Sequence, residues 1–479
     1  MKVLFAAAEA VPFAKTGGLA DVIGSLPKEL RRQDVDVRVI LPQYQDIPQR
    51  CQQQMAPVRQ TTVPVGWRQQ YCGVKQLTYQ GVVFYFIDNE YYFKRSGFYG
   101  YYDDAERYAF FCRAVLEVLP LIDFQPDVIH CHDWHTGLIS VFLEAYYRDN
   151  AFYDHIHTLF TIHNLRYQGV FSKDIFADIL ALDWSYFTAD KLEFFDQVNF
   201  MKGGLAFSEL ISTVSKTYAQ EIQYPYFGEQ LDGMLRRRRD DLTGIVNGID
   251  YDQYNPVTDS YIAVNYNADS FHLKQANKAS LQDLLRLPVK RGVPLLAIVS
   301  RLVDSKGLDL VACIMDEFVS REDVQLVVLG TGEANYQQMF QHFAWQYPAK
   351  VSVNLFFDDQ LAQQIYGGAD MLLMPSNYEP CGISQLIALR YGTIPVVRET
   401  GGLKDTVHSY NKYTEQGNGF SFANYNAHEF LYTMKRALGL FYDKPVWEKI
   451  VRNAMASDYS WQRSAKQYVE LYQRLVKGR

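Results

Sequence analysis

Short apolar segments recur along the chain, each followed by a segment of helix length, and this pattern constrains the fold more than any other feature. In the first half the apolar segments are Lys2–Glu9, Asp36–Pro42, Val82–Asp88, Asp127–Asp133, His157–His163 and Ile211–Ser215. Strands that are apolar on both faces are typical of a parallel sheet covered by helices on both sides. Between the first two, Leu19–Leu30 has apolar residues at helical spacing, which predicts an amphipathic helix.

The same pattern restarts in the second half of the chain. There the apolar segments are Pro294–Arg301, Val324–Gly330, Val351–Phe357, Met371–Ser376, Ile394–Glu399 and, more weakly, Asn418–Phe422. Two series of alternating strands and helices predict two Rossmann-like, doubly wound α/β domains. Glycines and a proline cluster in Thr243–Pro256, where we expect the hinge. We therefore expect domains at residues 1–246 and 247–457, with an amphipathic helix at 458–479 packing back on the first.

Composition excludes several classes of partner. Of the 479 residues, 48% are hydrophobic and 21% charged, a balance typical of soluble globular proteins. The net charge of −7 argues against a nucleic-acid partner, and the basic run Arg236–Arg239 is followed at once by Asp240 and Asp241. No apolar run approaches the roughly 18 residues of a membrane span, so we expect no membrane partner. The six cysteines lack CxxC spacing, which favours reduced thiols and a cytoplasmic location.

Candidate ligand-binding residues follow the predicted strands, because ligands of open parallel sheets bind beyond the carboxyl ends of the strands. With two such domains we expect the ligand in the cleft between them. The first strand is followed by Lys15-Thr16-Gly17-Gly18, which opens the next helix and suits an anion. The first strand of the second half is followed by a loop with Arg301 and Lys306, two cations suited to phosphate oxygens.

Two further loops of the second half have the same placement. Met371–Ser376 is followed by Glu379-Pro380-Cys381-Gly382-Ile383-Ser384. A carboxylate can accept hydrogen bonds from two hydroxyls, which suits a sugar, and Gly382 and Ile383 offer backbone amides where the next helix begins. Ile394–Glu399 is followed by a second glycine pair, Gly401-Gly402.

Histidines gather in the segment from His130 to His135 and at His163. Alternate residues of a strand share a face, so His130 and His132 would lie on one side, as metal ligands could. No HExxH motif and no spaced cysteine set accompanies them, so we predict no metal site. The chain also has no GxSxG motif.

Together these segments resemble the glycogen and starch synthase family of bacteria and plants, over nearly the whole chain. The matching stretches are Lys15–Val22 (KTGGLADV), His130–Gly137 (HCHDWHTG), Thr161–Phe171 (TIHNLRYQGVF), Asn199–Leu205 (NFMKGGL), Thr213–Lys216 (TVSK), Gly244–Asp250 (GIVNGID), Arg301–Gly307, Pro375–Gln385 (PSNYEPCGISQ) and Arg398–Val407 (RETGGLKDTV). The resemblance implies the GT-B fold, two Rossmann-like domains facing across a cleft. It also implies transfer of glucose from ADP-glucose to the non-reducing end of an α-1,4-glucan such as glycogen or a malto-oligosaccharide, with retention at the anomeric carbon and without metal or cofactor.

The resemblance also implies residue roles. The catalytic set is Lys15, His163, Arg301, Lys306 and Glu379: Lys15, Arg301 and Lys306 at the donor diphosphate, His163 at the glucose near its reacting carbon and Glu379 on glucose hydroxyls. The other donor-binding residues are Gly17, Gly18, Asp21, Asn247, Phe357, Cys381, Gly382, Ile383 and Ser384. The acceptor-binding residues are Glu9, Asp133, Trp134 and His135.

Two positions depart from the family pattern. The family often has an aromatic residue, commonly Tyr, that stacks on adenine, and the aligned residue here is Phe357. Many related transferases carry a second Glu for the ribose, where this chain has Ile387. The nucleotide preference between ADP and UDP therefore stays open.

Four other functions remain as alternatives. The chain could be another GT-B glucosyltransferase that uses UDP-glucose, a phosphorylase, or a non-catalytic glucan-binding homologue. A nicotinamide-dependent oxidoreductase is a further class, because Gly330-Thr331-Gly332 follows a strand, but Asn335 stands where the third glycine of that motif belongs. The sequence leaves open the oligomeric state, the acceptor length and allosteric control.

Overall fold

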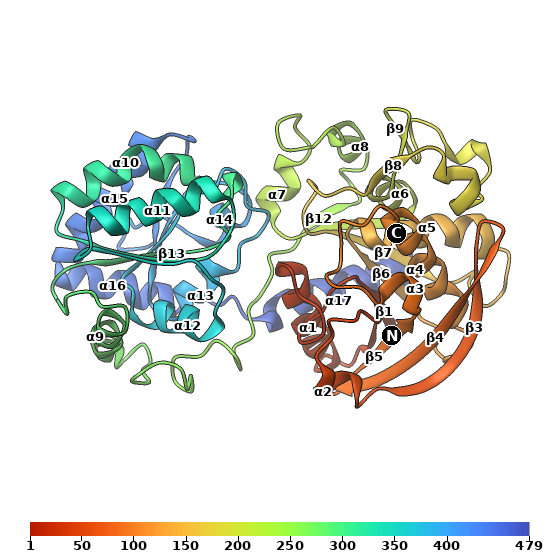
Figure 1. Ribbon diagram of the computed structural model, residues 1–479, viewed down its shortest axis with the longest axis horizontal. Helices are drawn as coiled ribbons and strands as arrows, with labels where there is room; N and C mark the ends of the chain where they lie inside the picture. Colours follow the sequence, from red (N-terminus) through yellow and green to blue (C-terminus); the bar gives the residue numbers. More distant parts are fainter. Residues whose placement is uncertain (479) are drawn as a thin grey trace. The chain divides into compact units, whose positions relative to one another are not determined.

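The computed structural model describes residues 1–478, which divide into two compact units (Figure 1). The first contains Met1–Asn247 and the C-terminal segment that begins at Trp461, and the second is Gly248–Ser460. These boundaries differ slightly from the predicted ones, because Asn247 belongs to the first unit and residues 458–460 belong to the second. Ile249 forms an isolated bridge to Ser460, which joins the two ends of the second unit.

A nine-stranded sheet forms the centre of the first unit, in the order β12-β11-β7-β6-β1-β2-β5-β4-β3. Its strands are β1 Lys2–Ala6, β2 Asp36–Pro42, β3 Ala56–Val65, β4 Arg68–Tyr79, β5 Val82–Asp88, β6 Val128–His132, β7 His157–Ile162, β11 Leu210–Thr213 and β12 Leu242–Gly244. The pairs from β12 to β5 are parallel, whereas β4 pairs antiparallel with both β5 and β3.

The hairpin of β3 and β4 at the edge of this sheet was absent from the predicted pattern. Its strands carry many polar residues because the edge is partly exposed, so they lack the continuous apolar run that marks the central strands. Gly66 in the connection has a φ of +58°, and a Cβ there would lie 1.8 Å from the carbonyl oxygen of Asp178. The turn therefore depends on glycine for both conformation and space.

The helical segments of the first unit are α1 Gly18–Arg31, α2 Gln49–Gln52, α3 Glu90–Phe93, α4 Asp104–Val118, η1 Trp134–Thr136, α5 Leu138–Phe142, η2 Leu143–Tyr147, η3 Phe176–Leu180, η4 Trp184–Tyr186, α6 Phe200–Phe207, α7 Lys216–Glu221, α8 Asp232–Arg237 and α17 Trp461–Lys477. A small antiparallel sheet adds β8 Val170–Ser172, β9 Glu193–Phe194 and β10 Gln197–Asn199. Helix α17 packs against α1, β6 and β7.

The second unit has a parallel six-stranded sheet in the order β15-β14-β13-β16-β17-β18. Its strands are β13 Leu295–Val299, β14 Gln325–Leu329, β15 Val351–Asn354, β16 Met371–Met374, β17 Ile394–Arg398 and β18 Phe420–Phe422. Its helical segments are η5 Phe271–Leu273, α9 Lys274–Leu284, η6 Asp304–Lys306, α10 Leu308–Arg321, α11 Ala334–Gln346, α12 Asp359–Gly368, α13 Ser384–Arg390, α14 Gly401–Thr406, α15 Ala427–Tyr442 and α16 Lys444–Met455.

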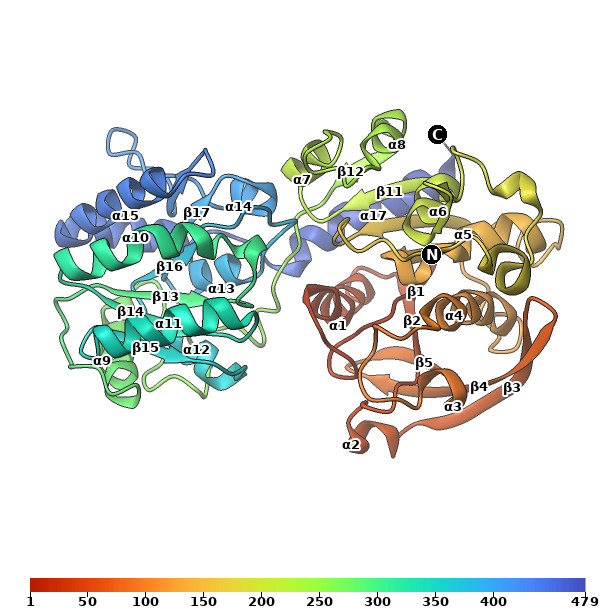
Figure 2. The same ribbon diagram turned by 45° about the horizontal axis from the view of Figure 1, so that its top comes forward.

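Both faces of this second sheet are buried, as its apolar strands predict. Along β13, Leu296 and Ile298 join the apolar cluster under α10, α11, α15 and α16, whereas Leu295 and Ala297 join the cluster under α9, α12 and α13. Figure 2 shows helices flanking these strands. The prediction of two doubly wound α/β domains is confirmed.

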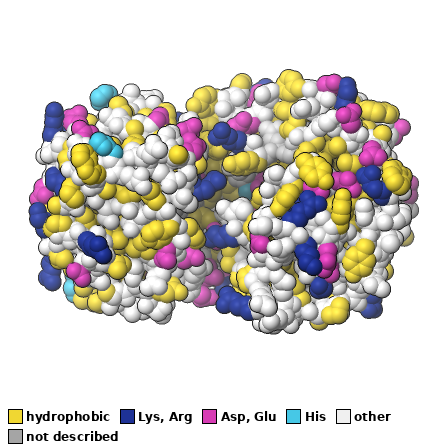
Figure 3. All heavy atoms as spheres, viewed as in Figure 1, with side chains coloured by type: hydrophobic (Ala, Val, Ile, Leu, Met, Phe, Trp, Pro, Cys, Tyr) yellow, Lys and Arg dark blue, Asp and Glu magenta, His cyan; other side chains and the backbone are white. Residues whose placement is uncertain are grey.

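The structure can be compared with the expectations drawn from composition for surface charge, membrane spans and cysteines. Acidic and basic side chains are interspersed on the face shown in Figure 3. Within residues 1–478, no helix is both long and apolar enough to cross a membrane. All six cysteines are free thiols, and only Cys313 is exposed.

Candidate active site

The loop between β1 and α1 carries the first group of predicted residues. Lys15 Nζ lies 2.8 Å from a carboxylate oxygen of Asp21, and both side chains are partly exposed. The buried Glu9 carboxylate fixes this loop, because it accepts hydrogen bonds from the backbone amide and hydroxyl of Thr16 and from the hydroxyl of Tyr99. Glu9 therefore acts in this structure as a support for the loop that presents Lys15.

Gly17 caps α1, and the fold itself does not require a glycine there. Its backbone is extended, and a Cβ at this position would meet no atom within 4 Å. No side chain caps the amides at this end of α1. Uncapped amides at the N-terminus of a 14-residue helix, beside an exposed lysine, form an arrangement suited to an anion. Gly18 is the first residue of that helix.

His163 follows β7 directly and lies among buried polar groups. Its backbone N–H donates to Asp133 Oδ1 at 2.7 Å, and its Nε2 lies 3.0 Å from His132 Nδ1. Burial lowers the pKa of His163 to about 3, so the ring is neutral near pH 7. Burial likewise raises the pKa of Asp133 to about 7, although the amides of His163 and Asn164 oppose this shift.

His130 and His132 share one face of β6, as the strand pattern predicts, with ring centroids 4.0 Å apart. His130 lies between Tyr472 of α17 and Thr161 of β7, at 2.8 and 2.5 Å from their hydroxyl oxygens. Burial lowers the pKa of both histidines well below the usual value. Within residues 1–478, no group of three side chains is arranged to hold a metal ion.

Trp134 and His135, predicted on the acceptor side, form a packed aromatic cluster. Their ring centroids lie 4.0 Å apart, and His135 also packs on Tyr99 at 4.6 Å and on Tyr108 at 4.9 Å. Both Trp134 and His135 are more than nine-tenths buried. Burial lowers the pKa of His135 to about 3. Asn247, the last residue of this unit before the chain enters the other, is buried, and its Oδ1 has no partner among the described residues.

In the second unit the structure brings Lys306 and Glu379 together. Lys306 Nζ lies 2.6 Å from Glu379 Oε2, which also accepts a hydrogen bond from the Ser376 hydroxyl at 3.2 Å. Arg301 is exposed in the same loop as Lys306 and forms no ion pair within the described part of the chain. Gly307, with a φ of +69°, lets this loop approach the end of β16, since a Cβ there would lie 2.0 Å from the carbonyl oxygen of Pro375.

The loop from Glu379 to Ser384 rests on the second glycine pair. A Cβ on Gly401 would lie 2.0 Å from the carbonyl oxygen of Glu379, and one on Gly402 would lie 2.1 Å from that of Cys381. Within the loop, Cys381 is buried and Gly382 has a φ of +75°. Ile383 and Ser384 follow where α13 begins.

Phe357 lies just beyond β15, next to Asp358, which caps α12. Phe357 is 70% exposed, which leaves its side chain accessible for stacking. An exposed aromatic ring beyond the carboxyl end of a strand is suited to a planar base.

Three residues outside the predicted set contribute to these sites. Tyr99 holds Glu9, His132 contacts His163, and Ser376 holds Glu379. The position of His132 on the same face as His130 was a usable signal. Tyr99 lies in an aromatic-rich loop far from Glu9 in the sequence, so no local pattern indicated its role.

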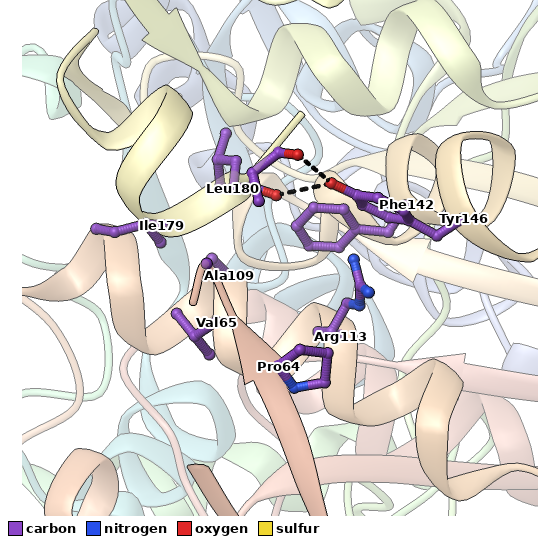
Figure 4. A pocket seen from close by; sticks show the side chains of 10 residues that line it. Pro64, Val65, Ala109, Arg113, Phe142, Tyr146, Ile179 and Leu180 are labelled. Carbon is purple, nitrogen blue, oxygen red and sulfur yellow. Dashed lines mark hydrogen bonds between the residues drawn. The ribbon is translucent and has the colours of Figure 1, made fainter. Parts of the chain in front are cut away.

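A separate cavity of about 230 Å³ lies in the first unit (Figure 4). Arg113 of α4 points toward Phe142 and Tyr146, and the Tyr146 hydroxyl donates to the carbonyl oxygens of Leu180 and Ala181. The remaining lining residues come from the end of β3 and the turn after it, from α4 and from η3: Pro64, Val65, Gly66, Ala109 and Ile179. No predicted site residue lines this cavity.

Comparison with known proteins gives matches in both units of the chain. The family model of the starch synthase catalytic domain matches residues 2–237, and that of group 1 glycosyl transferases matches residues 286–440. A glycogen synthase of Desulforamulus reducens is 58% identical over 476 residues, 99% of each chain. A glycogen synthase of Geobacillus stearothermophilus is 58% identical over 477 residues, 100% of this chain and 98% of that protein.

One solved structure similar to this chain is the catalytic domain of starch synthase IV from Arabidopsis thaliana, bound to ADP and acarbose. It has a TM-score of 0.92 and 33% identity, and the match covers 100% of this chain and 99% of that one. A sucrose-phosphate synthase from Thermosynechococcus elongatus, with a TM-score of 0.63, 16% identity and 99% coverage of both chains, shares the fold. The chain therefore belongs to the glycogen and starch synthase family of glycosyltransferases.

Proposed function

We propose that the protein transfers glucose from ADP-glucose to the non-reducing end of an α-1,4-glucan, with retention, and releases ADP. The observation that carries this proposal is the Lys306–Glu379 pair at the strand ends of the second unit, beside the exposed Arg301. A cation suited to a diphosphate lies next to a carboxylate suited to sugar hydroxyls, and this arrangement supports the proposal. The relatives named glycogen synthase and the plant starch synthase bound to ADP and acarbose support it.

The chemistry requires charge stabilisation at the leaving group. As ADP leaves the anomeric carbon, negative charge grows on the phosphate oxygen and positive character grows on the sugar. We assign Arg301 and Lys306 to binding of the diphosphate. We assign Lys15 and the N-terminal amides of α1 to stabilisation of the same negative charge. Prearranged cations and amides of this kind stabilise charge most effectively where water is excluded.

We assign Glu379 to the glucose hydroxyls and not to nucleophilic attack. Both the Lys306 ammonium and the Ser376 hydroxyl bind the same carboxylate oxygen, Oε2. These contacts stabilise the carboxylate and hold it in one orientation. Retention without a protein nucleophile then requires attack from the face of the leaving group, with the leaving phosphate accepting the acceptor proton. A covalent glucosyl adduct trapped on Glu379 would overturn this assignment.

We propose that the reaction needs neither a metal nor a cofactor, because the chain supplies the cations itself. Glycogen or a malto-oligosaccharide is the proposed acceptor, on the side of Trp134 and His135. The six free thiols favour a reducing compartment, so we propose that the enzyme acts in the cytoplasm. Turnover that is unchanged by EDTA and by exhaustive dialysis is the expected result.

The test is release of nucleoside diphosphate by the purified protein with a glycogen primer and either ADP-glucose or UDP-glucose. Primer-dependent ADP release with longer glucan chains is the expected result. Release from UDP-glucose alone would favour the second candidate, a UDP-glucose-dependent transferase, for which the absent hydroxyl at Phe357 is the relevant observation. Release from neither donor would favour a non-catalytic glucan-binding protein.

A further inference from the structure

The two ring nitrogens of His163 lie in different surroundings. Nε2 lies 3.0 Å from His132 Nδ1 in the interior of the first unit. Nδ1 has no hydrogen-bond partner within residues 1–478, and it is not among the fully buried unpaired atoms. Nδ1 is therefore the ring atom that a bound ligand can reach.

A neutral pair of histidines in this contact holds one proton between the two facing nitrogens. Either His132 Nδ1–H donates to His163 Nε2, or His163 Nε2–H donates to His132 Nδ1. In the first arrangement His163 carries its proton on Nδ1, the reachable atom. In the second, Nδ1 of His163 is a bare acceptor.

The far nitrogen of His132 distinguishes these arrangements. His132 Nε2 is buried and has no hydrogen-bond partner among the described residues. Its ring packs against His130 at 4.0 Å and Phe5 at 4.9 Å between centroids. The second arrangement would place a proton on this nitrogen and leave an N–H group unpaired in the interior. Buried N–H groups without a partner are rarer than buried acceptors without one, which favours the first arrangement.

We infer that His132 is a positioning residue that fixes His163 in the Nδ1–H form, so that His163 offers a hydrogen-bond donor to the bound sugar or its leaving group. This inference rests on the proposed function, because it specifies what His163 does at that site. The low pKa of both rings, caused by burial, keeps the pair neutral and the arrangement intact near neutral pH. The backbone N–H of His163 is bound to Asp133, which fixes the residue from its other side.

The direct test is the nitrogen-15 spectrum of the full-length protein labelled at histidine. The chain has 10 histidines, so the signals of His163 are assigned by their loss in His163→Gln. A protonated Nδ1 and an unprotonated Nε2 for His163 are the expected result. An unprotonated Nδ1 in the wild-type protein would overturn the inference. This measurement needs no turnover, so its outcome is separate from that of the ADP-release assay.

Substitutions at position 132 test the positioning role. In His132→Asn the side-chain amide can still donate to His163 Nε2, whereas His132→Leu can make no such bond. His132→Leu is expected to reduce kcat about tenfold or more, with a smaller change in KM, because the donor at His163 is no longer fixed. His132→Asn is expected to restore both the Nδ1–H signal and most of kcat. An Asn variant that folds but has the Leu phenotype would contradict the role.

Tyr472→Phe is the matched control. It removes a buried hydrogen bond to His130, two residues away on the same strand, and leaves the His132–His163 contact intact. The His163 spectrum and kcat are expected to remain at wild-type values. A change in the His163 protonation state in this variant would show that general loosening of the interior, and not His132, sets that state.

Discussion

At the scale of single residues, the structure separates side chains that hold the fold from side chains that only a ligand would use. Arg301 is exposed and forms no ion pair within residues 1–478. Gly17 is free of both backbone strain and steric crowding. The fold requires neither an arginine at 301 nor a glycine at 17, so substitutions there test function with little effect on stability.

Arg301→Ala and Lys306→Ala are each expected to reduce turnover by about 10²–10³-fold, because each removes a charge that we assign to stabilisation of the leaving diphosphate. The melting temperature is expected to change little for Arg301→Ala and modestly for Lys306→Ala, which loses the contact with Glu379. Steady-state ADP release and thermal unfolding measure the two effects. Lys435→Ala, at an exposed position of α15, is the control. Near-normal turnover in both variants would contradict the assignment.

Gly17→Ala is expected to weaken donor binding while changing stability by less than about 1 kcal/mol. The added methyl group meets open space in the protein, so only a ligand that approaches the backbone of this loop would collide with it. The measurement is the KM for ADP-glucose together with denaturant unfolding. Gly439→Ala in α15, where a Cβ also meets no atom within 4 Å, is the matched control. An unchanged KM would place the donor elsewhere.

At the scale of elements, β6 and the residues that follow β6 and β7 concentrate titratable side chains in the interior of the first unit. His130, His132, His135 and His163 all have lowered pKa values because they are buried, whereas burial raises the pKa of Asp133. These shifts tie the stability of this region to pH.

The first unit is expected to lose stability as the pH falls from about 7 to about 5. Below about pH 6.5, each of the four histidines binds a proton in the unfolded chain but not in the folded unit. Each therefore lowers the free energy of unfolding by up to about 1.4 kcal/mol for every pH unit of acidification. Asp133 acts in the opposite direction, because the folded state binds its proton first, so the net slope is at most about 4 kcal/mol per pH unit. Urea unfolding at several pH values measures this slope.

His135→Phe is expected to reduce that slope by about 1.4 kcal/mol per pH unit, since it removes one of the four buried titrations and keeps an aromatic ring against Trp134. His342→Gln, at an exposed position of α11, is expected to leave the slope unchanged. A wild-type stability independent of pH over this range would contradict the prediction.

At the scale of the whole molecule, the two units differ in how the chain builds them. The second unit is one continuous segment with an apolar cluster on each face of its sheet. The first unit needs α17, which arrives from the far end of the chain and buries five large side chains: Trp461, Tyr468, Leu471, Tyr472 and Leu475. Ser464 of α17 also donates to the carbonyl oxygen of Val246.

A fragment of residues 248–460 is therefore expected to fold alone and to be inactive, because Lys15 and His163 belong to the other unit. A fragment of residues 1–247 is expected to be unfolded or aggregated. Without these five side chains the unit loses about 7–15 kcal/mol of stabilising free energy from apolar burial. This loss is comparable to the whole free energy of unfolding of a typical domain, about 5–15 kcal/mol. Thermal unfolding of both fragments, with the full-length protein as control, measures this. A cooperatively folded 1–247 fragment would contradict the role given to α17.

The sequence by itself determined the fold class, the central strands and the loops that carry the predicted site residues. Strands β2 and β5 begin and end where the apolar runs predicted, because a strand buried on both faces must be apolar throughout. The same argument failed for β3 and β4, whose exposed faces are polar. The site residues stay predictions, although the motifs that contain them lie at strand ends, as a parallel sheet requires.

Only the tertiary structure decided which side chains meet. Glu9 with Tyr99, Lys306 with Glu379, and His130 with Tyr472 are joined across 73 to 342 positions of the sequence. No local pattern encodes such pairs, because the packing of distant elements sets the distance between them. The sequence therefore predicted the types of side chain available for the chemistry, whereas the contacts of His163 with His132 and Asp133 decided how the residue is held and which of its nitrogens a ligand can reach.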